Sequence, residues 1–400
     1  MGRTVGRLAL VSVVAIGLAA CAQNRARAPQ PSSVEPPPPI AQPSVPIQSQ
    51  PLDGPGLMSQ DQVGAVRVAF LAPLTGRAAS VGQALLNAAQ IAAIERGSDN
   101  FILQPYDTGG TAQGAASAAQ TAIAQGARMI IGPLFADSVR AVAPLAQSRN
   151  IPVVAFSTVS SVAGRGVYLI GFLVEEQLRR VLSQARSQGN SKIAALLPGS
   201  AEGEATAQAL RTVAPQVGVQ VVSVAFYDPT GANVSGPVSQ IIGSGLDTLL
   251  LSDRGLGLEA VAAQLPYSGL NPGQVMVLGT MLWNSETGLG REPMLVGAQY
   301  PAPDERSSAA FKEQYRNTYG ANPIDIAGLG YDATSLAAAL ARSGQPFSRS
   351  VFESSNGFAG VDGIFRFRPD GTVERGLAIK EITRDGAIEV VPAPTSFSGS

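Results

Sequence analysis

The feature that most limits the possible folds of this chain is an alternation of short apolar runs with longer helix-forming segments. Most of the runs are continuously apolar, which is typical of parallel strands covered by helices on both faces. The helix-forming segment 83–96 carries one narrow polar stripe and, apart from Glu95 and Arg96 at its end, is otherwise Ala, Leu and Ile, so it is expected to pack deeply. This pattern predicts an α/β fold with doubly wound parallel sheets. The expected strands are 66–71, 101–106, 128–132, 152–156, 192–198, 219–226, 247–252, 274–279 and 294–299.

The size of the folded part predicts two lobes. About 330 residues exceed what one hydrophobic core comfortably organises. The two halves resemble each other only in their strand–helix rhythm, and no internal repeat is evident. Near the C-terminus the strand–helix alternation ends. Asp-Gly steps at 370–371 and 385–386 there predict the hairpin turns of a small β element.

The first twenty residues have the pattern of an export signal. Arg3 and Arg7 are followed by the uncharged segment 8–20, which is shorter than the roughly 20 residues needed to span a bilayer. The segment ends in Leu18-Ala19-Ala20-Cys21, which resembles the bacterial lipobox. We expect a lipoprotein signal peptide over 1–20 and lipidation of Cys21; an ordinary signal peptide with a chance cysteine is the alternative.

The residues after Cys21 bear on where the chain is anchored. Ala22 and Gln23 follow the cysteine; in bacterial lipoproteins an Asp there favours the inner membrane, so the resemblance implies a periplasmic protein anchored to the outer membrane. Residues 21–64 contain many prolines and few apolar side chains, and we expect an extended linker. This linker either provides reach across the periplasm or is a simple spacer.

Composition excludes several classes of function. The chain has no histidine and a single cysteine, which rules out Ser-His-Asp triads, imidazole–zinc sites and disulfides. Its net charge is −1, so no bulk attraction to nucleic acid is expected. No Walker A sequence or nucleophile elbow occurs, and no spacing singles out a carboxylate pair. We expect neither an enzyme nor a protein with a metal ion or cofactor.

One glycine-rich motif has two possible interpretations, a dinucleotide-binding loop or a tight turn. Residues 255–260 match the G-x-G-x-x-A pattern of dinucleotide-binding loops. That fingerprint also needs an acidic residue at the end of the next strand, where this chain has Gly279-Thr280-Met281. A tight strand-to-helix turn is therefore the favoured interpretation.

Polar residues directly after the expected strands mark a candidate ligand cleft. Ligands of open α/β sheets bind outside the carboxyl ends of the strands, and hydroxyl and backbone N–H groups there can hold a carboxylate. The alternative is that these residues only cap helices and complete turns. The candidates are Thr75, Ser80, Asp107, Pro133, Ser157, Thr158, Tyr227 and Asp253.

Several segments together resemble the leucine-binding protein family, the type I periplasmic binding proteins. They are VRVAFLAPLTGRAASVGQALLNAAQIA, YDTGG, MIIGPL, IPVVAFST and, near the end, FRFRPDGTV with LAIKEI. The resemblance implies two lobes joined by three crossovers around a ligand cleft. The implied bounds are 65–172 plus 300–345 for lobe 1, 173–299 plus 346–392 for lobe 2, and 393–400 for a flexible tail.

The resemblance also implies roles for the cleft residues. Ser157 and Thr158 match positions that hold a ligand carboxylate in members that bind amino acids, whereas Ala136 replaces an expected serine. Tyr227 and Asp253 fall near positions that hold the ligand's amino group.

Two functions follow from the resemblance. An outer-membrane tether and altered cleft positions favour the branch of penicillin-binding protein activators, lipoproteins that bind and activate a peptidoglycan synthase. The alternative is the substrate-binding subunit of an ABC importer for branched-chain or other amino acids, which would bind an amino-acid-like ligand. An envelope hydrolase is a third and weaker option.

Overall fold

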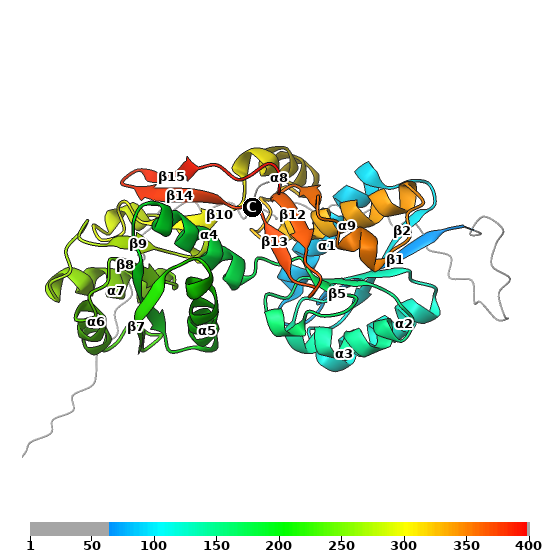
Figure 1. Cartoon of the computed structure of the whole chain (residues 1–400). Coiled ribbons are helices and arrows are strands. Elements are labelled where there is room, and N and C mark those ends of the chain that lie inside the picture. Colours follow the sequence, from blue (N-terminus) through cyan, green and yellow to red (C-terminus); the bar gives the residue numbers. More distant parts are fainter. Residues whose placement is uncertain (1–63, 398–400) are drawn as a thin grey trace, which may run out of the picture. The chain divides into compact units, whose positions relative to one another are not determined.

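Two sheets covered by helices make up most of the computed structural model, which describes residues 64–397 (Figure 1). The expected signal peptide, Cys21 and nearly all of the linker lie outside the described residues, as do the last three residues of the tail. None of the helices in the described part of the chain is long and apolar enough to cross a bilayer.

The first sheet is wholly parallel, with the strand order β2-β1-β3-β4-β5. Its strands are β1 (Val66–Ala72), β2 (Phe101–Asp107), β3 (Met129–Ile131), β4 (Val153–Ala155) and β5 (Val167–Leu169). The helices that alternate with them are α1 (Ala79–Arg96), α2 (Ala112–Ala124) and α3 (Ala136–Gln147). Figure 1 shows α2 and α3 together on one side of this sheet. Strands β1, β3, β4 and β5 are almost wholly buried, as their apolar sequences predict, whereas the edge strand β2 is partly exposed.

The second sheet is parallel in its centre and antiparallel at one end, in the order β15-β14-β10-β9-β8-β6-β7. Its first five strands are β6 (Lys192–Pro198), β7 (Gln220–Tyr227), β8 (Thr248–Leu251), β9 (Met276–Leu278) and β10 (Gln299–Ala302). The last two are β14 (Ala378–Thr383) and β15 (Gly386–Val391). The covering helices are α4 (Val174–Ser187), α5 (Ala201–Gln216), α6 (Ser235–Ile242) and α7 (Gly255–Tyr267), and the short helix η3 (Met281–Ser285) follows β9.

The C-terminal third returns to the first sheet before the chain ends in the second. Helix α9 (Ala327–Arg342) packs along α1, next to α8 (Glu305–Tyr319). After α10 (Arg349–Phe352) come the antiparallel strands β11 (Phe358–Gly360), β12 (Gly363–Phe367) and β13 (Val373–Arg375). The chain therefore passes between the two lobes three times, after β5, after β10 and after β13. The predicted α/β fold class is confirmed, as are both Asp-Gly hairpins.

The lobe bounds of the structure differ from those implied by the sequence. Phe352, Phe365 and Val373 lie in the same buried cluster as β1, so residues 346–375 pack with the first lobe. Residues 300–302 belong to β10, which pairs with β9 and β14 in the second sheet. The physical reason is that the sequence of an amphipathic strand identifies its apolar face but not the hydrophobic core against which that face packs.

Two further expectations differ from the structure. The apolar run 294–299 is mostly a turn, because Gly297 has a φ of +85° and only Gln299 joins a strand. The described part of the expected flexible tail contacts the fold at two points: Ala393 is buried, and the guanidinium of Arg366 lies 4.5 Å from the ring centre of Phe397, while residues 394–396 are exposed.

Candidate functional site

The loop after β1 is held in place by the carboxylate that ends β2. Asp107 accepts hydrogen bonds from the backbone N–H groups of Leu74 (2.8 Å) and Gly109 (2.8 Å). The hydroxyl of Thr75 also donates to Asp107, at 2.6 Å. Burial opposes ionisation of Asp107, but the hydrogen bonds from Thr75, Gly109 and Leu74 outweigh it and lower its pKa. Thr75 and Asp107 thus shape the loop by bonding each other, while Ser80 is exposed in the first turn of α1.

The edge formed by β3 and β4 is built on close backbone contacts. Gly132 has a φ of +88°, and a side chain there would place its Cβ 2.0 Å from the carbonyl oxygen of Leu71. Pro133 follows in a cis peptide, is buried, and accepts the N–H of Phe156 at 3.0 Å. Only glycine fits position 132, so this residue determines where the strand end and the following loop lie.

This edge carries the hydroxyl groups that the sequence pointed to. Ser157 is buried, and its hydroxyl oxygen accepts the N–H of Val159 at 3.2 Å, which leaves the hydroxyl proton able to donate. Thr158 is exposed. Phe135 and Val159, which follow β3 and β4, are 41% and 43% exposed, a large fraction for side chains of this type.

The start of α3 lies directly after Phe135. No side chain caps this helix end, so its first backbone N–H groups have no partner within the helix. Asp137 in the first turn is turned to Arg140, with which it forms a 2.6 Å ion pair. Hydroxyls, backbone donors and exposed apolar side chains are therefore all offered by the loops that follow β3 and β4.

The second sheet offers an acceptor group at its carboxyl edge. The buried hydroxyl of Tyr227, at the end of β7, donates to the carboxylate of Asp253 at 2.5 Å. Burial first, and then this hydrogen bond, raise the pKa of Tyr227. The indole N–H of Trp283 donates to the backbone oxygen of Asp253 at 3.0 Å. These bonds fix Asp253 while each of its oxygens keeps further lone pairs.

The glycine motif at 255–260 serves this arrangement. A Cβ at Gly257 would lie 2.4 Å from a carboxylate oxygen of Asp253, so the second glycine allows α7 to start close to that residue. The N–H of Gly255 donates to Glu286 at 3.4 Å. Two carboxylates thus lie at this helix end, which agrees with the strand-to-helix turn and disfavours a bound phosphate.

A buried charged cluster that the sequence did not indicate links the crossovers. Arg375, at the end of β13, donates to the backbone oxygen of Ile170 at 2.8 and 3.1 Å, and its guanidinium lies 4.6 Å from the ring centre of Phe172. It also faces Asp332, 3.7 Å away. Burial lowers the pKa of Arg375, and the two acids Asp332 and Asp362 oppose this change. Arg375 therefore joins the first crossover to the third.

The two buried acids of this cluster, Asp332 and Asp362, make few hydrogen bonds. Burial first, and then its neighbour Asp362, raise the pKa of Asp332 to about 7. Burial raises the pKa of Asp362 to about 6, although Arg375 and Lys312 favour its ionised form. One oxygen of each carboxylate has no hydrogen-bond partner among the described residues.

These pKa values predict how stability changes with pH. Both acids hold protons in the folded state at pH values where the unfolded chain has lost them, so stability should fall as pH rises from about 4 to about 7. Replacing Asp362 by Asn should raise the free energy of unfolding at pH 8 by about 1–3 kcal/mol and flatten this decline. Urea unfolding at several pH values measures both effects. The exposed Asp137→Asn serves as control, and a variant with the unchanged pH slope would contradict the assignment.

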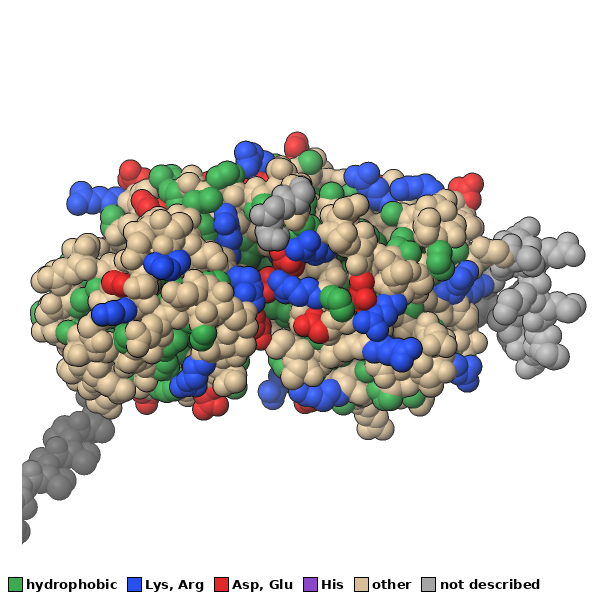
Figure 2. Space-filling view, in the orientation of Figure 1, with side chains coloured by type: hydrophobic (Ala, Val, Ile, Leu, Met, Phe, Trp, Pro, Cys, Tyr) green, Lys and Arg blue, Asp and Glu red, His purple; other side chains and the backbone are tan. Residues whose placement is uncertain are grey.

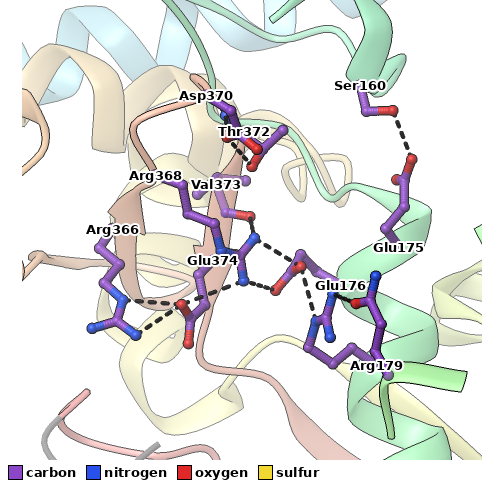
Figure 3. Close-up of polar contacts among 11 residues, drawn as sticks. Ser160, Glu175, Glu176, Arg179, Arg366, Arg368, Asp370, Thr372, Val373 and Glu374 are labelled. Atoms are coloured by element: carbon purple, nitrogen blue, oxygen red, sulfur yellow. Dashed lines mark hydrogen bonds and ion pairs between the residues drawn. The ribbon is translucent and has the colours of Figure 1, made fainter. Parts of the chain in front are cut away.

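A second group of charges joins the β12–β13 hairpin to the start of α4 (Figure 3). Arg368 donates to both oxygens of the buried Glu176, at 2.9 and 3.0 Å, a geometry that favours this pair strongly. Glu374 pairs with Arg366 at 2.9 Å on the other side of Arg368. Ser160 donates to Glu175 at 2.7 Å. On the face shown in Figure 2, acidic and basic side chains lie close together where the hairpin meets α4.

Comparison with known proteins agrees with this architecture. The family model described as "Periplasmic binding protein" matches residues 65–387. None of the curated proteins matches the chain.

Solved structures share the fold at low sequence identity. A leucine-binding protein, LivK, of Thermotoga maritima is 21% identical with a TM-score of 0.57, covering 82% of this chain and 99% of its own. A putative branched-chain amino acid ABC transporter protein of Rhodospirillum rubrum is 17% identical with a TM-score of 0.70, covering 82% and 100%. A solute-binding protein of Rhodopseudomonas palustris in complex with 3,4-dihydroxybenzoic acid is 17% identical with a TM-score of 0.58, covering 83% and 99%.

The match to the family model spans most of the chain and includes both sheets and all three crossovers. The members of this family bind ligands in the periplasm, which implies the same compartment here. The chain belongs to the periplasmic binding protein family.

Proposed function

We propose that the protein is a solute receptor that binds a small carboxylic acid of the amino-acid type for an ABC importer. The observation that carries this proposal is the edge formed by β3 and β4, where Ser157 and Thr158 offer hydroxyls beside the uncapped start of α3. Hydroxyl and backbone donors of this kind bind a carboxylate without a buried counter-charge. No catalytic role is proposed.

The remaining parts of such a ligand find matching groups. The exposed Phe135 and Val159 provide apolar surface for the ligand's side chain. Asp253 on the second lobe is held by Tyr227 and would accept a hydrogen bond from an ammonium or hydroxyl group of the ligand. The similar structures whose names include a branched-chain amino acid or 3,4-dihydroxybenzoic acid support a carboxylate ligand.

Removing the hydroxyls should weaken binding. Thr158→Val and Ser157→Ala are each expected to lower the affinity about 10- to 100-fold, because a hydrogen bond to a charged group contributes about 1.5–3 kcal/mol. Calorimetric titration with leucine, phenylalanine and 4-hydroxybenzoate measures the loss and distinguishes amino acids from aromatic acids. Ser161→Ala, an exposed serine nearby in the chain, should bind as the unchanged protein does. Equal affinities for all three variants would refute the assignment of the carboxylate site.

The second candidate function is activation of a penicillin-binding protein. It is favoured by the lipobox that ends in Cys21 and by the Pro-rich residues 21–64, which would anchor the protein to the outer membrane and give it reach. Capture of a class A penicillin-binding protein together with faster glycan polymerisation would support it. Unchanged polymerisation with every synthase of the same cell would argue against it.

A further inference from the structure

A cavity lies at the far end of α1 from the candidate cleft. It has a volume of about 680 Å³, is open to solvent on one side, and is lined by the last turn of α1, by α8 and α9, and by β11. The 18 residues of α1 place about 25 Å between this cavity and the loop of Thr75, at 1.5 Å per residue. The volume lies in the range of small-molecule sites, and the cavity shares no residue with the cleft.

Four aromatic side chains form part of the cavity wall. Phe311 and Tyr331 face each other with ring centres 5.3 Å apart, and Phe358 and Phe365 form a second pair at 5.5 Å. The lining also includes Ser335, whose hydroxyl oxygen is buried and has no hydrogen-bond partner among residues 64–397. The four rings favour a ligand with an apolar body, and the polar lining residues favour polar groups at its other end.

The rim of the cavity carries two arginines. Arg342 donates to the backbone oxygen of Arg96 at 2.8 Å, and Arg96 donates to the hydroxyl of Tyr331 at 3.4 Å. In the described part of the chain neither guanidinium forms a salt bridge with a carboxylate. Glu95, the acid on the rim, accepts the hydroxyl of Tyr331 at 2.5 Å. Asp332 also borders the cavity, but its side chain is fully buried and faces Arg375.

We propose that this cavity binds an amphipathic carboxylate. Its apolar body would pack between the two aromatic pairs, and its carboxylate would bind Arg342 and Arg96, whose donors match that group in number and geometry. This site is independent of the solute-receptor function, because none of its groups takes part in the cleft.

Titration with 4-phenylbutyrate tests the site, with decanoate as a second anion and 4-phenylbutylamine as the matched cation. Both anions should bind at this site with one equivalent each, or phenylbutyrate alone if the aromatic pairs select a ring. The amine should bind at least 10-fold more weakly than phenylbutyrate. Arg342→Gln should weaken phenylbutyrate binding at least 5-fold. Ala339→Trp, which fills the cavity from an exposed lining position, should abolish it.

Two controls separate this site from the cleft and from a folding defect. Ala309→Trp lies on exposed surface outside the cavity lining and should leave binding and the unfolding temperature unchanged. Thr158→Val should also leave phenylbutyrate binding at this site unchanged, whatever it does to amino-acid binding. Absence of phenylbutyrate binding, binding that survives Ala339→Trp, or equal binding of the amine would overturn the proposal.

Discussion

Replacing Arg375 by methionine is expected to lower the free energy of unfolding at pH 8 by about 3–5 kcal/mol, the range seen when one partner of a buried ion pair is removed. The substitution would leave Asp332 and Asp362 buried without their counter-charge. It would also remove both hydrogen bonds to Ile170 and the contact with Phe172. Urea unfolding followed by circular dichroism measures the loss.

The pH dependence separates the charge effect from the loss of packing. At pH 5 both acids would be largely protonated in the folded variant, so the loss should be smaller than at pH 8. Adding Asp332→Asn to Arg375→Met should recover part of the stability at pH 8, since one uncompensated charge is then removed. An equal loss at both pH values would show that packing alone accounts for the effect.

Replacing Gly132 by alanine is expected to have the second large effect. The new Cβ would lie 2.0 Å from the oxygen of Leu71, and the φ of +88° disfavours any side chain. The left-handed backbone alone costs about 1–2 kcal/mol, and the overlap with β1 should bring the total to at least about 3 kcal/mol. Because Gly132 precedes Pro133, solute binding should weaken together with stability.

Gly126→Ala is the matched control for this prediction. Gly126 has a φ of +83°, but no atom lies within 4 Å of the position that a Cβ would occupy there. Its substitution should therefore show the backbone cost without the overlap, a loss of about 1–2 kcal/mol with unchanged solute affinity. If thermal and urea unfolding give the same loss for both variants, close packing against β1 is not what requires glycine at 132.

The sequence was most informative where a local pattern had one physical meaning. The apolar run of β6 and the Asp-Gly step at 370–371 predicted a buried strand and a hairpin, and both are present. The lobe to which Phe365 belongs could not be predicted, since either core would accept the same apolar face. The strand expected at 294–299 was wrong because Met294 and Leu295 are buried without being in a strand.

In the candidate site, too, some residues could be identified from the sequence and others could not. Ser157 and Thr158 were identified because they directly follow a strand, and parallel strands bring such positions to one edge. The bond between Thr75 and Asp107 joins residues 32 positions apart and depends on the register of β1 with β2. Arg375 could not be found from the sequence, because a charged residue in an alternating strand normally indicates a solvent-facing position.

Thermal unfolding in the presence of candidate solutes tests the solute-receptor function most directly. A ligand at about 1,000 times its dissociation constant should stabilise the protein by about 4 kcal/mol, so one amino acid or related carboxylic acid should raise the unfolding temperature by several degrees. Thr158→Val should remove this rise, whereas Ala339→Trp should keep it. An unfolding temperature that stays constant with every amino acid and aromatic acid tested would contradict the account.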